Sequence, residues 1–297
     1  MSTGFPGSDA ERDFARERRR QAVARLAARL RAQPDDVTSV LPLDPVVEAL
    51  GRRGERDLGV MTIPIGAIVG TVDRRPDSFD RSFRPSSPAL RQRWERIAAA
   101  RRRGEPMPPI DVYRVGQIYF VRDGHHRVSV ARALGDTTIE ARVREIDTDV
   151  AATPELRLRD LPLKRHERLF WERVPLAPSD RGRIVLFDEW RYAQLADVVE
   201  AWGFRASQAA GRLLSREETA ARWLAEDFEP IIQALHDAEV GGPGTDAEQY
   251  LRIATLRYLL LYTHEWTDEL LDRLLAEEPR PGSDEDTMVH RIRRELG

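Results

Sequence analysis

One stretch, residues 118–135, constrains the fold of this chain more than any other. It reads IYFVRDGHHRVSVARALG. Its first four residues are β-branched or aromatic, as in a strand, and Gly124 allows the backbone to reverse sharply. The apolar positions from Val128 onward share one helical face, which ends at Gly135. The sequence therefore predicts a strand, a tight turn and a short helix in succession.

The turn inside this stretch has the chemistry of an anion-binding site. It consists of Asp123, Gly124, His125, His126 and Arg127. The first turn of a helix carries N–H groups without a partner in the helix, and the helix dipole is positive there. We therefore expect these amides to bind a phosphate or carboxylate, with Arg127 as a bidentate clamp. In the alternative, Asp123 caps the helix, the histidines lie at the surface and Arg127 pairs with a carboxylate.

The composition excludes several classes of site. The chain of 297 residues contains no cysteine, which rules out disulfides, thiolate zinc sites and cysteine nucleophiles. No apolar run approaches the roughly 20 residues that a membrane-spanning helix needs. The N-terminus also lacks the basic and apolar regions of a signal peptide. We therefore expect a cytoplasmic protein with no membrane partner.

Charge is distributed unevenly, although the net value is only −3. Residues 11–31 contain eight arginines and three acids, within a predicted helix over residues 10–32. The apolar face predicted for this helix consists of Phe14, Val23, Leu26 and Leu30. Such a basic helix could contact nucleic acid, an acidic partner or the protein's own acidic C-terminus, and we favour the last.

The pattern of elements predicts an α+β protein with five parts. These are a helical arm (1–58), a small mixed domain (59–147), a linker (148–187), an all-helical domain (188–278) and an acidic tail (279–297). In the mixed domain we expect strands at 60–65, 110–115, 118–121 and 138–143, with helices from Ser87 to Gly104 and at 125–134. Residues 52–58 are expected to link the arm to this domain. The loop over residues 73–85, with Asp73 and Arg84, has the composition of a binding loop.

The later part of the chain carries helix signals. A short strand is expected at residues 184–187, followed by a helix over residues 190–202 that ends at Gly203. Capping boxes begin two further helices, one at Ser215 with Glu218 and one at Thr245 with Glu248. A last helix is expected from Thr267 to Ala276. From Glu229 onward the chain has fifteen acids and seven arginines, which argues against a DNA reader in this half.

The order of elements over residues 60–145 resembles that of the ParB/sulfiredoxin-like superfamily. In ParB-type nucleotide-binding domains the matching turn reads Gly-Glu-Arg-Arg, which aligns with Gly124 and Arg127 and implies a grip on the phosphates of CTP. Sulfiredoxins carry Gly-Cys-His-Arg at this turn, and His125 stands in place of their cysteine, which excludes sulfinic acid reduction. The Glu-Asn-x-Gln-Arg motif of ParB proteins does not follow Ile146, so the chain departs from the CTP-gated clamp.

The turn is most similar to the Asp-Gly-His-Thr-Arg turn of free-serine kinases in the same superfamily. Asp123, Gly124, His125 and Arg127 match it, and His126 replaces the threonine. The resemblance implies that Asp123 acts near a phosphoryl acceptor, as a base or through a magnesium ion. The whole layout is also similar to actinobacterial proteins with a ParB N-terminal domain.

Three functional hypotheses follow. The first is a protein that binds CTP, ATP or ADP, with magnesium, and acts as a slow phosphohydrolase or switch. Its expected nucleotide-binding residues are Gly124, His125, His126, Arg127, Asp73 and Arg84, and its expected catalytic residues are Asp123, His125 and His126. The second is a small-molecule kinase in which Asp123 is the base and an acid from the loop between Asp73 and Asp80 assists. The third is a non-enzymatic DNA or protein adaptor, and a homodimer is compatible with each hypothesis.

Overall fold

The computed structural model describes residues 4–32, 39–72, 78–238 and 242–261. It divides the chain into two compact units, an N-terminal unit (Met1–Arg168) and a C-terminal unit (Leu169–Gly297). The boundary falls inside the predicted linker 148–187. Asp73, the predicted helix from Thr267 and the acidic tail lie outside the described residues.

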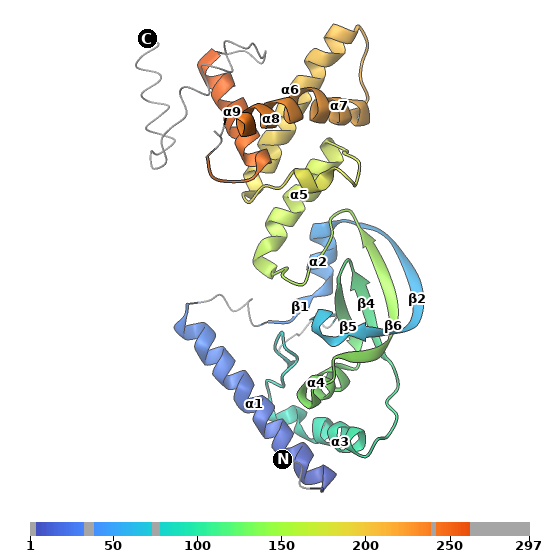
Figure 1. The fold of residues 1–297 in the computed structure, drawn as a ribbon. Coiled ribbons are helices and arrows are strands. Elements are labelled where there is room, and N and C mark those ends of the chain that lie inside the picture. The colour runs from blue at the N-terminus through green and yellow to red at the C-terminus, as the bar shows by residue number, and fades with distance from the viewer. Residues whose placement is uncertain (1–3, 33–38, 73–77, 239–241, 262–297) are drawn as a thin grey trace. The chain divides into compact units, whose positions relative to one another are not determined.

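The N-terminal unit is built on a six-stranded mixed sheet with the strand order β1-β3-β5-β4-β6-β2 (Figure 1). The pairs β1–β3, β3–β5 and β4–β6 are parallel, whereas β4–β5 and β2–β6 are antiparallel. The strands are β1 (Leu41–Pro42), β2 (Arg52–Pro64), β3 (Ile68–Thr71), β4 (Ile110–Val115), β5 (Ile118–Asp123) and β6 (Thr138–Thr148). The predicted hairpin of β4 and β5 is confirmed, and the sheet places its second strand at the centre beside β3.

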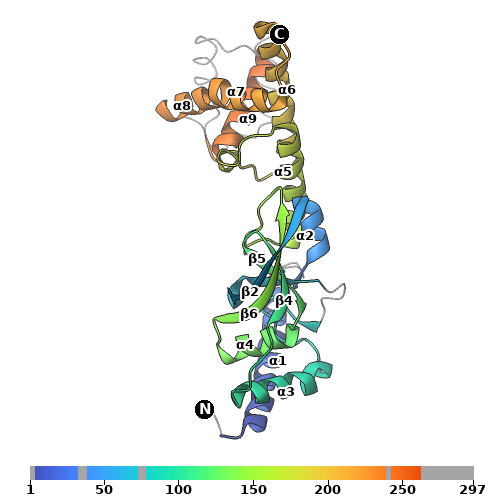
Figure 2. The ribbon, with the colours of Figure 1, turned by 90° about the vertical axis from the view of Figure 1, so that its right-hand side faces the viewer.

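Four α-helices accompany this sheet: α1 (Pro6–Leu30), α2 (Leu43–Leu50), α3 (Arg91–Arg102) and α4 (His125–Leu134). In both views α3 and α4 lie together near one end of the sheet, and α2 lies near the other (Figures 1 and 2). The predicted helix at 125–134 is confirmed, and it ends at Gly135 in the left-handed conformation, with φ 86°. The position of α4 directly after the central strand β5 brings its N-terminus to the edge formed by the ends of β3 and β5.

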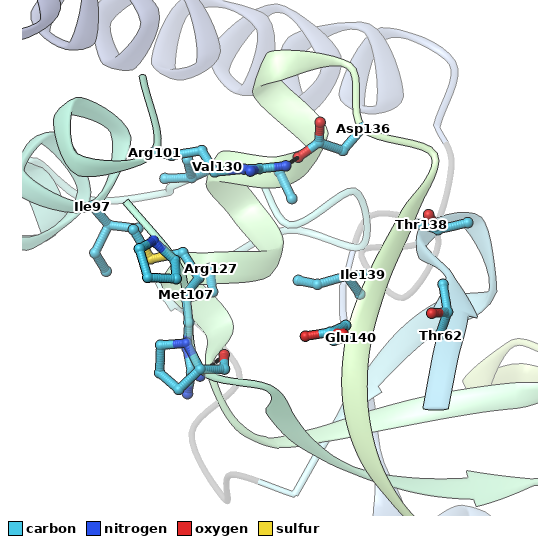
Figure 3. A pocket seen from close by; sticks show the side chains of 13 residues that line it. Thr62, Ile97, Arg101, Met107, Arg127, Val130, Asp136, Thr138, Ile139 and Glu140 are labelled. Atoms are coloured by element: carbon cyan, nitrogen blue, oxygen red, sulfur yellow. Dashed lines mark hydrogen bonds and ion pairs between the residues drawn. The ribbon is translucent and has the colours of Figure 1, made fainter. Parts of the chain in front are cut away.

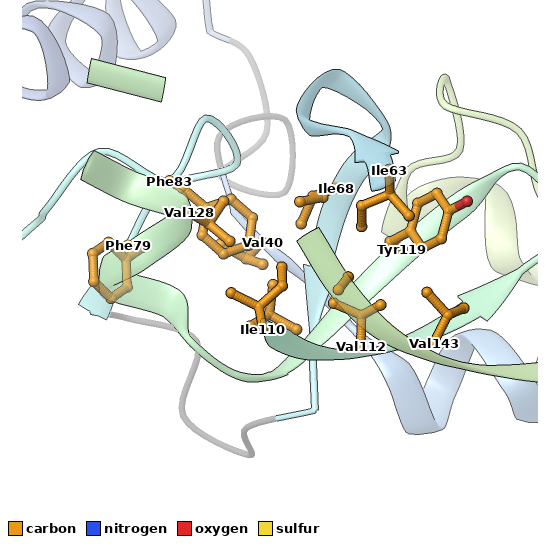
Figure 4. Close-up of a cluster of buried hydrophobic side chains, with 12 residues drawn as sticks. Val40, Ile63, Ile68, Phe79, Phe83, Ile110, Val112, Tyr119, Val128 and Val143 are labelled. Atoms are coloured by element: carbon orange, nitrogen blue, oxygen red, sulfur yellow. The ribbon is translucent and has the colours of Figure 1, made fainter. Parts of the chain in front are cut away.

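Two apolar clusters hold the unit together. The larger cluster joins the sheet to the loop before α3 and to the inner face of α4; among its members are Ile68, Phe83, Ile110 and Val128 (Figure 4). The smaller cluster joins α1, α3 and α4, and at its centre the ring of Trp94 meets the ring of Phe14 edge to face at 5.6 Å. Burial of these apolar surfaces contributes roughly 25 cal/mol per Å² removed from water. Each end of α4 is therefore fixed by packing on its neighbours.

The structure corrects the prediction for α1. Phe14 is buried, but Val23, Leu26 and Leu30 are 61%, 58% and 79% exposed, so they do not form the packed face. The buried residues of α1 combine apolar and acidic side chains: Asp9, Ala10, Asp13, Phe14, Glu17 and Ala28. Asp13 accepts a hydrogen bond of 3.1 Å from Nε of Arg102 on α3. The predicted contact of α1 with the acidic tail lies outside the described residues.

The prediction of a link at residues 52–58 is wrong, because β2 begins at Arg52 and pairs with β6 along its whole length. Only Ile63 is buried among its residues. Residues 52–58 read RRGERDL and lack the apolar alternation typical of a strand. Charge pairs across the two strands, such as Arg56 with Glu145, stabilise this edge of the sheet instead.

The regular elements of the C-terminal unit are helical within its described residues. They follow α5 (Leu161–Arg173), which crosses the unit boundary, and are α6 (Glu189–Ala210), α7 (Arg216–Trp223), a π-helical turn (Leu224–Phe228), α8 (Glu229–Asp237) and α9 (Asp246–Leu261). Both predicted capping boxes are confirmed by hydrogen bonds, at Ser215 with Glu218 and at Thr245 with Glu248. Within the described part of the chain, no helix is both long and apolar enough to cross a bilayer.

Two predictions in the later part of the chain are wrong. Residues 184–187 form no strand. The helix α6 continues through Gly203 to Ala210. At Gly203 a Cβ atom would lie 2.3 Å from the methyl group of Thr219 on α7. This glycine therefore permits a close contact between two helices and does not end one. The linker passage also contains the helix α5.

Candidate functional site

The predicted turn between β5 and α4 depends on Gly124. This residue has φ 106°, a conformation that L side chains rarely adopt, and precedes the first residue of α4. A Cβ atom at this position would lie 2.5 Å from Cγ2 of Ile110 on β4. Glycine is therefore required both for the reversal and for the close approach of β4.

Among the residues that the structure describes, no side chain caps the N-terminus of α4. The alternative in which Asp123 caps the helix is therefore wrong, because its carboxylate turns to Arg127 instead, at 2.7 Å from Nη2. The first hydrogen bond of the helix runs from the amide of Val128 to the carbonyl of Gly124, at 3.0 Å. The amides ahead of Val128 have no carbonyl of their own helix to bond, and they lie at the positive end of its dipole.

Arg127 is engaged by protein acceptors. Its Nη1 donates to the carbonyls of Pro108 and Pro109, at 2.6 Å and 2.8 Å, and its Nη2 donates to Asp123. A guanidinium has five N–H donors, so part of its capacity joins the turn to the connection before β4. The pairing of Arg127 with a carboxylate is confirmed, whereas its role as a phosphate clamp stays a prediction.

A cavity of about 380 Å³ lies beside Arg127, between α3, α4 and the start of β6 (Figure 3). Its wall combines apolar side chains with two arginines and two acids, so it has no excess of either charge. Its polar side chains are Thr62, Arg101, Arg127, Asp136, Thr138 and Glu140. This cavity is therefore a weaker candidate for an anion than the uncapped end of α4.

His125 is held at the end of β3. Its Nε2 lies 2.7 Å from the hydroxyl oxygen of Thr71. Its ring stacks on Phe79 and Phe83, with centroid distances of 6.2 Å and 6.3 Å. The imidazole therefore has a fixed orientation at the first position of α4.

His126 is a neutral residue in this environment. Burial, then the positive charge of Arg93, then His125 lower its pKa from 6.5 to about 4. Its Nδ1 is buried and has no hydrogen-bond partner among the described residues, and its ring meets Phe79 edge to face at 5.3 Å. At neutral pH this side chain can exchange hydrogen bonds with a ligand, but it supplies no positive charge.

The structure separates Arg84 from the other predicted binding residues. Its Nε donates to Asp80 at 2.9 Å, and it lines a different cavity together with Arg132 in the last turn of α4. Three residues beside the turn, Thr71, Phe79 and Phe83, are absent from the predicted site. Thr71 could have been found, because it ends the segment Ile68-Val69-Gly70-Thr71, which forms β3 and in which three of the four residues are β-branched.

No family model, curated protein or solved structure matches this chain. Its function is therefore argued from its own residues. Among the residues that the structure describes, no group of three or more His, Cys, Asp or Glu side chains could hold a metal ion.

Proposed function

We propose that this chain is a nucleotide-binding protein that holds phosphate groups at the first turn of α4, in a domain of the ParB/sulfiredoxin-like type. The observation that carries the proposal is the N-terminus of α4, which follows the left-handed Gly124 and has no side-chain cap within the described part of the chain. Amides at the N-terminus of a helix donate to phosphate oxygens, and the helix dipole favours negative charge there.

The neighbouring side chains support this assignment. His125 and the neutral His126 present imidazole groups at the first turn, and the side chain of Asp123 is 60% exposed beside it. Arg127 adds a positive charge, with part of its hydrogen-bonding capacity already used. A magnesium ion that arrives with the nucleotide would find one carboxylate here, so phosphate oxygens and water would supply its other ligands.

Calorimetric titration of the full chain with CTP, ATP and ADP, with and without magnesium, tests the proposal. We expect at least one nucleotide to bind. Arg127→Ala should weaken that binding by about 1.5 to 3 kcal/mol, the scale of a hydrogen bond to a charged group. Arg122→Ala is the matched control, because Arg122 is an exposed arginine on the same strand–turn segment.

A second variant is needed because Arg127 also joins the turn to Pro108 and Pro109. His125→Ala leaves those bonds in place and should also weaken binding, while circular dichroism confirms that the variants are folded. Failure of every nucleotide to bind would leave the adaptor hypothesis. A salt-dependent mobility shift with duplex DNA then tests that hypothesis.

Phosphotransfer to a hydroxyl compound is a second candidate function, and the exposed carboxylate of Asp123 favours it. A base must reach the proton that it removes, and this carboxylate is open to solvent beside the proposed phosphate site. We expect Asp123→Asn to abolish turnover while nucleotide binding persists. Product release that needs no hydroxyl compound would indicate hydrolysis instead.

The remaining proposals concern the setting of the protein. We place its action in the cytoplasm, with a second copy of the chain as a candidate partner. Sedimentation of the full chain with and without nucleotide tests the homodimer.

A further inference from the structure

A second cavity of the N-terminal unit, which we call the arginine cavity, has a volume of about 370 Å³. It lies between the start of β3, the turn at residues 80–84, the last turn of α4 and the segment at residues 154–157. Four of its lining residues are arginines and one is an acid: Arg81, Arg84, Arg132, Arg157 and Asp80. The cavity therefore carries a clear excess of positive charge.

Arg132 is a partly buried cation in the wall of this cavity. Its Nη2 donates to the carbonyls of Ile65 and Ile68, each at 2.6 Å, and its guanidinium carbon lies 5.4 Å from the centroid of the Phe83 ring. Its Nε is buried and has no acceptor among the described residues. Burial lowers the pKa of this arginine more than Asp80 raises it. The guanidinium of Arg132 is thus partly desolvated, and the groups that position it, two carbonyls and an aromatic ring, are neutral.

Both carboxylate oxygens of Asp80, the one acid that lines the cavity, already accept hydrogen bonds. Asp80 is buried, and its Oδ2 accepts from Nε of Arg84 at 2.9 Å. Its Oδ1 accepts from the backbone amides of Ser82 and Arg84, both at 2.9 Å. Asp80 therefore holds the turn at residues 80–84 in shape, and among the described residues no carboxylate forms an ion pair with Arg132.

The wall opposite this turn is also fixed. Nη2 of Arg81 donates to the carbonyls of Pro154 and Leu156, at 2.9 Å and 2.8 Å. These bonds bring the half-buried Arg157 to the rim of the same cavity. The arrangement is preorganised, because Arg81 and Arg132 are positioned by backbone carbonyls and Arg84 is positioned by Asp80.

We propose that the arginine cavity binds a small molecule that carries a phosphomonoester group. The cavity places four arginines against one carboxylate, and the partly buried Arg132 forms no ion pair among the described residues. An excess of partly desolvated positive charge is costly, and a dianion offsets that cost. Guanidinium groups bind phosphate oxygens in a bidentate manner, and the volume falls in the range of small-molecule sites.

This site goes beyond the proposed nucleotide site and is separate from it. None of the residues 123–127 lines the cavity, and Arg132 lies in the last turn of α4 whereas the nucleotide site is at its first. Seven residues of helix separate Arg132 from His125, which corresponds to about 10 Å along the axis.

Calorimetric titration of the full chain with glycerol 3-phosphate tests the proposal, with glycerol as the uncharged control. We expect glycerol 3-phosphate to bind and glycerol not to bind. Arg157→Gln should weaken the binding about tenfold or more, the effect of one lost charged hydrogen bond. Arg142→Gln is the matched control, because Arg142 is an exposed arginine on β6, which lies three strands from β3 in the sheet.

A second variant tests Arg132. Removal of this side chain could unfold the unit, because Arg132 donates hydrogen bonds to the carbonyls of Ile65 and Ile68. Arg132→Lys keeps the charge but removes the forked donor, and its affinity is interpreted only if its melting temperature matches that of the wild type. Absence of binding to the wild type, or equal affinity in Arg157→Gln and Arg142→Gln, would overturn the proposal.

The two sites are distinguished by measuring the binding of each ligand to the variant of the other site. His125→Ala should leave glycerol 3-phosphate binding unchanged, and Arg157→Gln should leave nucleotide binding unchanged. Loss of both ligands in Arg157→Gln would mean one shared site and would refute a separate arginine cavity. Loss of nucleotide binding alone in His125→Ala supports two sites.

Discussion

The imidazole Nε2 of His125 lies 2.7 Å from the hydroxyl oxygen of Thr71, which joins the first residue of α4 to the last residue of β3. The two residues are 54 positions apart in the chain. They meet because β3 pairs in parallel with β5, so both strands end at the same edge of the sheet. The orientation of the histidine at the proposed phosphate site is thus set by a distant strand.

Replacement of Thr71 tests this contact. Thr71→Val keeps the shape of the side chain but removes the hydroxyl, so it should lower the free energy of unfolding by about 0.5 to 1.5 kcal/mol. Thr71→Ser keeps the hydroxyl and should retain the contact with His125. Urea denaturation measures both variants, and a Thr71→Val variant as stable as the wild type would show that the contact contributes nothing.

The bond between α3 and α4 gives a second prediction. Nε1 of Trp94 donates to Oγ of Ser129 at 2.8 Å, and both residues are buried. Ser129→Ala leaves the indole N–H buried without this acceptor, so the free energy of unfolding should fall by about 1 to 3 kcal/mol. When Trp94 is already replaced by Phe, Ser129→Ala should lower the free energy of unfolding by a smaller amount. Equal losses with and without Trp94→Phe would refute an energetic coupling between the two residues.

Two glycines at the ends of α4 form a matched pair for a third prediction. Gly124 and Gly135 both have positive φ, 106° and 86°, but a Cβ at Gly124 would lie 2.5 Å from Ile110 whereas none of the described atoms lies within 4 Å of a Cβ at Gly135. Gly135→Ala should therefore cost about 1 to 2 kcal/mol from backbone strain alone. Gly124→Ala should lower the free energy of unfolding by a larger amount, which thermal unfolding measures. Equal losses in the two variants would contradict the claim that a Cβ at Gly124 collides with Ile110.

His126 provides a prediction for pH dependence. Its pKa is about 4 in the folded chain and 6.5 ordinarily, chiefly because the side chain is buried. The unfolded chain therefore binds a proton more readily, and this residue lowers the stability progressively as the pH falls from about 6.5 toward 4. The His126→Gln variant should lack the decrease in stability that His126 causes over this pH range. An NMR titration of the imidazole with a midpoint near 6.5 would contradict the prediction.

The core of the C-terminal unit gives a last prediction. Nε1 of Trp223 donates to the hydroxyl of Tyr250 at 2.9 Å, and that hydroxyl donates to the carboxylate of Asp227. Tyr250→Phe leaves both partners buried without this bond, so the free energy of unfolding should fall by about 1 to 3 kcal/mol per group. Tyr113→Phe is the control, because the hydroxyl of Tyr113 has no partner among the described residues, and equal losses would refute the prediction.

The sequence predicts elements well where the signal is local. The β4–β5 hairpin, the turn at Gly124 and the end of α4 at Gly135 were recognisable because strand alternation, helix periodicity and glycine conformation act over a few residues. Predictions failed where distant partners decide. Residues 52–58 form a strand that pairs with the distant β6, and Gly203 lies inside α6 where it approaches Thr219 of α7 closely.

The features of the candidate site also fall into two groups, those set by neighbouring residues and those set by distant ones. The residues of the turn and their place at the start of a helix were determined by the sequence itself, because each depends on its immediate neighbours. Only the tertiary structure decided that Arg127 bonds to Pro108 and Pro109, that His126 is neutral, and that Arg84 lines a separate cavity with Arg132. Hydrogen-bond partners and desolvation depend on groups far along the chain, which come together only when the sheet and its helices have packed.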